Sequence, residues 1–301
     1  GSFLCWLRGM VVQPSLSAVH TGGVWEWQGS GDNDGQGNNV MPKLRKYEQK
    51  LFVACVEGQR EQDPEKKKWL KFRNNVESEN YIKNRVDRLF WKEKETIAWI
   101  RKFAEDSIFF DVGANIGIYC LYSAKIRKNT VYAFEPHMGN YTNLLDNINE
   151  NKLLNCQAFP LALGDKTNLT TLGVKNMIEG VSDSNVGETS EYYHGCVEMS
   201  MDWLVEQGTL PQPDHIKIDV DGHEDKVVDG AIKTISKCKS VLVELDLEKH
   251  MATYEKMLDT GLTLRTKINR NEHTGSQLYN MIFQKGWTGG VTTDPNKLSH
   301  A

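Results

Sequence analysis

Apolar runs and amphipathic segments alternate through the C-terminal two thirds of the chain. Short apolar runs predict strands at 108–112, 130–134, 156–162, 215–220 and 240–246. Helical spacing of apolar positions predicts helices at 116–126, 138–149, 225–236 and 248–259. Two further runs, 262–268 and 278–284, are expected to form a terminal hairpin. Such alternation is typical of an α/β protein whose mostly parallel sheet is covered by helices on both faces.

A smaller insertion interrupts this alternation. Extended segments are expected at 169–174 and 195–199, followed by a short helix at 201–207. Ser200 precedes that helix and is its expected N-cap, because a serine hydroxyl can accept a hydrogen bond from a free backbone N–H.

The pattern divides the chain into four parts. Residues 1–42 include a Gly-, Asn- and Asp-rich run with little to bury, which predicts a flexible N-terminal segment and linker. Residues 43–105 are expected to form a helical extension that either packs on the sheet or covers a pocket as a lid. The main domain is placed at 106–287 and a loose C-terminal tail at 288–301.

The first strand of the main domain runs into the turn Asp111-Val-Gly-Ala-Asn-Ile-Gly117. Glycines in such a turn let the backbone approach a ligand closely. Glu135 ends the next apolar run, where a carboxylate can accept hydrogen bonds from both ribose hydroxyls of a nucleoside cofactor. The turn lacks the G-x-G-x-x-G triplet of dinucleotide sites, and Asp111 would repel a pyrophosphate. An ammonium or sulfonium group suits this acidic strand end better, which favours S-adenosylmethionine over NAD.

Three motifs together resemble the FkbM family of S-adenosylmethionine-dependent methyltransferases. They are the turn at 111–117, Phe134-Glu135-Pro136, and the stretch Ile216-Lys-Ile-Asp-Val-Asp-Gly-His-Glu224. The resemblance spans roughly residues 90 to 285. It implies a class I methyltransferase (Rossmann-like) fold with a seven-stranded sheet, and O-methylation of a hydroxyl on a saccharide or secondary metabolite. The acceptor itself is not specified.

The expected cofactor contacts lie at the ends of three successive strands and on the polar strand that follows. They are Asp111, Gly113, Ala114, Asn115, Gly117, Glu135, Pro136, Leu163, Asp165 and Asp219. Leu163 and Asp165 follow the third strand, where the adenine ring is expected, and Asp165 is suited to accept from its amino group.

A second group of polar residues is predicted to carry the chemistry. Lys217, Asp219 and Asp221 alternate along one strand, so they share a face, and burying all three without partners would be costly. They are therefore expected to line a polar cavity at the carboxyl end of the strand. Asp219 would orient the acceptor hydroxyl or take its proton, and His223 is a candidate base. A simple Lys217–Asp219 pair is the alternative.

A metal site is a further alternative at the same strand ends. Asp219, Asp221 and Glu244 offer carboxylate oxygens of the kind that Mg²⁺ prefers. A bound metal would lower the pKa of the acceptor hydroxyl.

Composition limits the classes of binding partner that are expected. The formal net charge is −4 and charged residues make up 25% of the chain, so no general surface for nucleic acid is expected. No apolar run reaches the length of a membrane span. The six cysteines are scattered without a C-x-x-C pair, which predicts reduced thiols in a cytoplasmic protein. A small-molecule or saccharide acceptor is the expected partner, and the oligomeric state is left open.

Two other functions stay open at this point. An NAD-dependent oxidoreductase would share the strand–turn–helix, but it would not need Asp111. A non-catalytic cofactor-binding protein would keep Asp111 and Glu135, but it would not need the polar strand at 217–221.

Overall fold

The computed structural model describes residues 17–21, 24–28, 50–56, 68–74, 79–87, 93–175, 180, 184–270 and 275–294. The chain divides into two compact units, Gly1–Tyr47 and Glu48–Ala301. In the first unit, β1 (Ser17–Thr21) pairs antiparallel with β2 (Val24–Gln28), a hairpin that the predicted flexible segment 1–42 did not include. The rest of that segment lies outside the described residues, and the predicted domain boundaries stay predictions.

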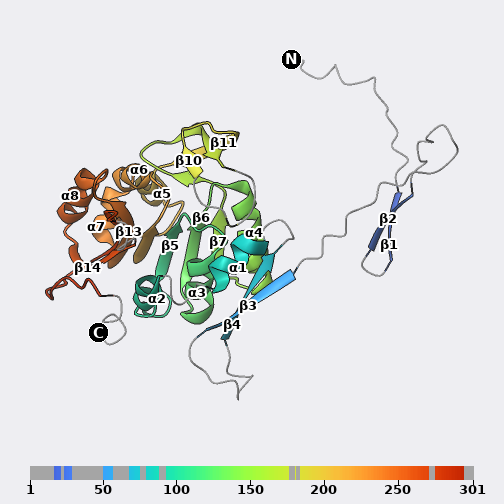
Figure 1. The fold of residues 1–301 in the computed structure, drawn as a ribbon, viewed down its shortest axis with the longest axis horizontal. Helices are drawn as coiled ribbons and strands as arrows, with labels where there is room; N and C mark the ends of the chain where they lie inside the picture. The colour runs from blue at the N-terminus through green and yellow to red at the C-terminus, as the bar shows by residue number, and fades with distance from the viewer. Residues whose placement is uncertain are drawn as a thin grey trace, which may run out of the picture. The chain divides into compact units, whose positions relative to one another are not determined.

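A seven-stranded sheet forms the centre of the second unit (Figure 1). Its order is β14-β15-β13-β12-β5-β6-β7, and every neighbouring pair is parallel except those of β15. The strands are β5 (Ile108–Val112), β6 (Thr130–Phe134), β7 (Cys156–Phe159), β12 (His215–Ile218), β13 (Ser240–Asp246), β14 (Thr263–Asn269) and β15 (Leu278–Gln284). The chain reverses its direction of travel across the sheet between β5 and β12. Ligands bind at such switch points, outside the carboxyl ends of the strands.

Helices cover both faces of the sheet. One face carries α2 (Lys94–Ile100), α3 (Ile118–Ile126) and α4 (Met138–Glu150), and the other carries α5 (Met201–Glu206), α6 (Glu224–Asp229), α7 (Ile232–Lys237) and α8 (Met251–Asp259). Figure 1 shows the two groups on opposite sides of the central strands. Adjacent strand residues serve different cores, since Phe109 packs with α2 and α3 whereas Phe110 packs on the opposite face. The predicted α/β architecture is therefore confirmed.

None of the helices in the described part of the chain combines the length and apolar character needed to cross a bilayer.

Two predicted elements of the main domain are divided in the structure. The strand expected at 156–162 ends at Phe159, and after Pro160 a short β8 (Ala162–Leu163) joins another sheet. The helix expected at 225–236 breaks into α6 and α7 at Gly230. A Cβ on Gly230 would lie 1.9 Å from the Gly164 carbonyl oxygen, so the close approach of two backbones interrupts the helix.

The inserted extended segments form a small four-stranded sheet, in the order β10-β9-β11-β8. Its remaining strands are β9 (Asn168–Val174), β10 (Ser184–Val186) and β11 (Tyr192–Met199). The predicted cap of the following helix is confirmed, because Ser200 Oγ accepts a hydrogen bond from the backbone N–H of Trp203.

The prediction of a helical extension at 43–105 is wrong for its first half. β3 (Lys50–Val56) and β4 (Lys68–Asn74) pair antiparallel, and among the described residues of this stretch the helical parts are α1 (Glu79–Asp87) and α2. A two-residue period explains the difference: Leu70 and Phe72 are fully buried, whereas Lys71 and Arg73 are partly exposed. The helical pattern of the later residues was extended too far towards the N-terminus.

Asparagine side chains of α4 and of its C-cap residue, Asn151, pair with the backbone of β4. Asn151 accepts from the Lys71 N–H at 3.0 Å and donates to the Lys71 carbonyl at 2.7 Å. Asn147 accepts from the Arg73 N–H at 2.6 Å, and Asn143 donates to the Arg73 carbonyl at 3.0 Å. Four helical residues rise about 6 Å, close to the repeat of two strand residues. The helix therefore presents amides to β4 much as a neighbouring strand would.

Asn147→Ala should destabilise the protein by about 1–3 kcal/mol. Asn147 is fully buried and also donates to the Ile116 carbonyl at 2.8 Å, so the change leaves buried backbone groups without partners. Urea unfolding measures the loss, with Asn149→Ala on the exposed face of the same helix as the control. Equal stability of the two variants would contradict a structural role for the asparagine pairing.

Candidate active site

A pocket lies at the carboxyl ends of β5, β6, β12 and β13. Its volume is about 890 Å³, which includes space open to solvent at its mouth. The predicted site residues in its wall are Gly113, Asn115, Glu135, Pro136, Leu163, Asp219, Asp221 and Glu244. The predicted residues outside the wall are Asp111, Ala114, Gly117, Asp165, Lys217 and His223. Eight of the fourteen predicted site residues therefore line this pocket.

The glycine turn is shaped by the end of β12. A Cβ on Gly113 would lie 1.9 Å from the carbonyl oxygen of Asp219, and Gly113 has a φ of 77°, so only glycine fits there. Asn115 also adopts a left-handed conformation, with a φ of 51°, and its backbone N–H donates to Glu135 Oε2 at 2.7 Å. The N–H groups of Gly113 and Ala114 donate to the Phe134 carbonyl at 3.0 and 3.1 Å, so the turn is fixed to the end of β6.

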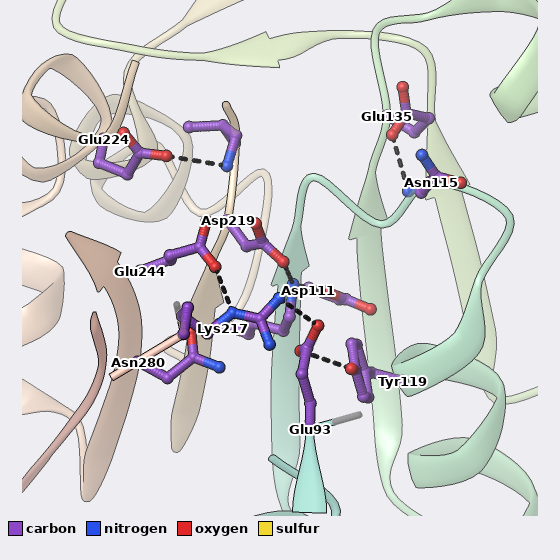
Figure 2. Close-up of polar contacts among 12 residues, drawn as sticks. Glu93, Asp111, Asn115, Tyr119, Glu135, Lys217, Asp219, Glu224, Glu244 and Asn280 are labelled. Atoms are coloured by element: carbon purple, nitrogen blue, oxygen red, sulfur yellow. Dashed lines mark hydrogen bonds and ion pairs between the residues drawn. The ribbon is translucent and has the colours of Figure 1, made fainter. Parts of the chain in front are cut away.

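Glu135 joins the turns that follow β5 and β6. Its Oε1 accepts from the His137 N–H at 2.9 Å, and Figure 2 shows its contact with Asn115. Burial raises the pKa of the Glu135 carboxyl to about 7, although the N–H groups of His137 and Asn115 oppose that shift. Both oxygens are held in place at the pocket wall before any ligand binds.

Lys217 is buried between two carboxylates. Its Nζ lies 2.8 Å from Asp219 Oδ2 and 3.8 Å from Asp111 Oδ1. The side chains of Lys217 and Asp111 are 2% and 0% exposed, whereas that of Asp219 is 28% exposed. Of the three, only Asp219 reaches the pocket wall. Asp111, which the sequence placed against the cofactor's ammonium, instead faces Lys217.

The charges of this triad depend on one another. Burial disfavours the charged form of Lys217, but Asp219 and Asp111 outweigh it and raise the pKa of the ammonium. Burial raises the pKa of Asp111 to about 6, against the opposing effect of Lys217. Burial also opposes the ionisation of Asp219, yet Lys217 holds its pKa below the usual value. The triad thus supplies a fixed carboxylate at the pocket.

A second network was not predicted from the sequence. Arg270 Nε donates to Glu244 at 2.8 Å and its Nη2 donates to Glu93 at 2.8 Å, while the Tyr119 hydroxyl donates to Glu93 at 2.5 Å. Figure 2 shows Glu93, Tyr119 and Glu244 converging from α2, α3 and β13. Burial, followed by the negative charge of Asp219, raises the pKa of Glu244 to about 8, and Arg270 opposes this.

Glu93 was missed because its surroundings in the sequence are Lys- and Glu-rich, which is typical of an exposed helix face. In the structure Glu93 and Glu95 are both buried, and Glu95 accepts a hydrogen bond from Asn280 at 2.7 Å. Arg270 and Asn280, which bond Glu93 and Glu95, lie more than a hundred residues away, so local composition held no signal for these contacts. Glu93 and Arg85 also bring the N-terminal extension to the pocket wall.

The structure gives no support to the magnesium hypothesis. Asp219 pairs with Lys217, and Glu244 pairs with Arg270. Within the described residues, no group of three or more His, Cys, Asp or Glu side chains is arranged to hold a metal ion. Asp221 lines the pocket from a loop position with a left-handed φ of 54°.

His223 and Asp165 are not brought to the pocket. His223 Nε2 lies 3.2 Å from Glu198 Oε1 on β11, and Asp165 Oδ2 lies 3.6 Å from Lys226 Nζ. The loop before α6 is held by Glu224, which accepts from the backbone N–H groups of Val220 and Gly222. This arrangement directs His223 to Glu198 and leaves Asp219, Asp221 and Glu244 as the carboxylates of this side of the pocket.

Known proteins resemble this chain over the same region. A family model described as the methyltransferase FkbM domain matches residues 111–271. The hexuronic acid methyltransferase AglP of Haloferax volcanii is 29% identical over 171 residues, which cover 56% of this chain and 69% of that protein.

Two solved structures are also similar. The methyltransferase FkbM of Methylobacillus flagellatus is 16% identical with a TM-score of 0.45, over 63% of this chain and 47% of that chain. TYW2 of M. jannaschii in complex with AdoMet is 14% identical with a TM-score of 0.39, over 72% of this chain and 83% of that chain. This chain therefore spans about half the length of the solved FkbM structure.

The raised pKa of Glu135 predicts a pH dependence of stability. The folded protein holds the proton of the Glu135 carboxyl more tightly than the unfolded chain, in which the pKa of this group is near 4.5. The stabilisation that this proton gives at low pH is therefore lost as the pH rises to about 7. Glu135→Gln should make the free energy of unfolding fall less steeply over this range in urea titrations. The exposed Glu248→Gln is the control and should keep the wild-type slope. If Glu135→Gln kept the wild-type dependence of unfolding free energy on pH, this dependence would not come from Glu135.

Proposed function

We propose, since this chain belongs to the FkbM methyltransferase family, that it transfers a methyl group from S-adenosylmethionine to a hydroxyl of a saccharide or secondary metabolite. Its seven-stranded sheet has the class I methyltransferase (Rossmann-like) arrangement expected from the sequence. The observation that carries the proposal is the carboxylate-lined pocket where Gly113 and Glu135 meet Asp219. The similarity to a hexuronic acid methyltransferase supports a saccharide as the acceptor.

The residues that line the pocket suit S-adenosylmethionine by their charge. Gly113 lets the turn lie against the Asp219 carbonyl, and the methionyl carboxylate of the cofactor suits the N-terminus of α3, which follows the turn. Glu135 is positioned to accept hydrogen bonds from the ribose hydroxyls, and Leu163 lies where the adenine is expected. The wall contains the carboxylates of Glu93, Asp219, Asp221 and Glu244 as well, a surrounding that favours a cationic cofactor. When bound, the cofactor supplies a methyl group activated by its sulfonium.

Asp219 is the residue proposed to act on the acceptor. Lys217 fixes its carboxylate at the pocket wall and keeps it ionised, so it can accept a hydrogen bond from the acceptor hydroxyl and align the oxygen. As the new carbon–oxygen bond forms, the hydroxyl proton becomes strongly acidic, and a weak base such as Asp219 is sufficient to take it. Lys217 is then a positioning residue, and His223 has no direct part.

The two rival functions are less well supported. An NAD-dependent oxidoreductase would have to hold a pyrophosphate among the carboxylates of this wall, and membership of the family favours methyl transfer. A non-catalytic cofactor-binding protein would not need Asp219 fixed and partly exposed beside the glycine turn.

The expected location is cytoplasmic. The buried thiols of Cys120, Cys156, Cys196 and Cys238 are free, which supports the expectation of a reducing compartment.

Asp219→Asn tests the function most simply. The variant should bind S-adenosylhomocysteine in calorimetry with an affinity near that of the wild type, and it should lose about 10²–10⁴-fold of methyl transfer to saccharide acceptors, because the carboxylate's charge and basicity are gone. Asp229→Asn, which removes another lysine-paired aspartate outside the pocket, is the control and should stay active.

Binding of NAD in place of S-adenosylhomocysteine by the wild type would contradict the proposed cofactor. Wild-type turnover in Asp219→Asn would remove this residue from the mechanism.

A further inference from the structure

Among the described residues, two arginines line the pocket, and they differ in their partners. Arg270 is paired with both Glu93 and Glu244. Arg85 makes one hydrogen bond, from Nε to the Gly180 carbonyl at 2.6 Å, and no ion pair among the described residues includes it. The terminal N–H groups of its guanidinium are therefore available in a wall whose other charged side chains are mostly carboxylates.

We propose, on the basis of the methyl transfer proposed above, that Arg85 binds a carboxylate of the acceptor. The acceptor is then an acidic saccharide, of the uronic acid type, and Arg85 is the residue that distinguishes it from a neutral sugar.

The N-terminal extension holds Arg85 in a fixed place. Ile82 and Val86, which flank it on α1, are buried in the core. A Cβ on Gly180 would lie 3.4 Å from Ile82 Cγ1, so α1 packs closely on this glycine, and the Gly180 N–H donates to Asn140 in the pocket wall at 2.7 Å. Through β4, the extension is also held by the asparagines of α4. A guanidinium fixed in this way loses little freedom when it binds a ligand.

The position of Arg85 favours binding of the acceptor, and not of the cofactor, to its guanidinium. Arg85 lines the same pocket as Asp219, the carboxylate proposed to hold the acceptor hydroxyl. Burial opposes the ionisation of Asp219, but Lys217, then Arg270 and Arg85, lower its pKa. The carboxylate of the cofactor is instead expected at the N-terminus of α3.

The chemistry of the wall favours a carboxylate as the anion. A planar carboxylate matches the fork of a guanidinium with two parallel hydrogen bonds. A doubly charged phosphate would be repelled more strongly by the ionised carboxylate of Asp219, which shares the wall.

Matched acceptors test the inference on the full-length protein with S-adenosylmethionine. The methyl glycosides of glucuronic, galacturonic and mannuronic acid are compared with those of glucose, galactose and mannose. The wild type should prefer a uronide. Arg85→Gln should lower kcat/KM for that uronide by roughly tenfold to a hundredfold and leave the neutral sugar almost unchanged, since one charged hydrogen-bond partner is lost. Lys83→Gln, on the exposed face of the same helix, is the matched control and should behave as the wild type.

The other possible results distinguish an error in the inference from an error in the proposed function. Equal losses for both sugar classes in Arg85→Gln, or weaker binding of S-adenosylhomocysteine in calorimetry, would mean that Arg85 holds the cofactor or the fold, and the inference would be wrong. Equal use of uronides and neutral sugars by the wild type would overturn the inference and leave the proposed function standing. Methylation of neither class would contradict the saccharide function itself, and the inference with it.

Discussion

The site depends on one buried lysine. Lys217 of β12 lies directly opposite Asp111 of β5 in the parallel sheet, and its ammonium is 5.1 Å from the centre of the Tyr119 ring. A lone ammonium at this depth would be very unfavourable, so the carboxylates of Asp111 and Asp219 are required to compensate it. This requirement holds the end of β12 against the turn after β5. The close approach of the Asp219 carbonyl then restricts position 113 to glycine.

The pocket is completed by parts of the chain that are far apart in sequence. The core strands supply Glu135, Asp219 and Glu244 at their carboxyl ends, whereas the N-terminal extension supplies Arg85 and Glu93. Arg270 joins the two parts, because it bonds Glu244 on β13 and Glu93 at the start of α2. A change in the extension is therefore expected to alter the acceptor side of the pocket while the glycine turn keeps its shape.

The local sequence was sufficient to predict the central strands, but it was not sufficient to predict the contacts that surround them. β5, β6 and β13 begin and end where the apolar runs predicted, because buried parallel strands are short apolar runs between turns. The strand pair β3–β4 was missed because the helical pattern of the later residues was extended over the two-residue alternation of β4. Glu93 was missed because Arg270, which pairs with it, is distant in sequence. His223 sat in a convincing motif, yet the turn of the loop directs it to Glu198.

A double-mutant cycle on Asp111 and Lys217 tests the central claim most directly. Asp111→Asn, Lys217→Met and the double variant are compared with the wild type by urea unfolding at constant pH. If the buried charges depend on each other, each single change should cost about 3–5 kcal/mol, and the double change should cost less than the sum by about 0.5–3 kcal/mol. Single effects that add to within about 0.5 kcal/mol would show that Asp111 and Lys217 act independently, and would contradict the account.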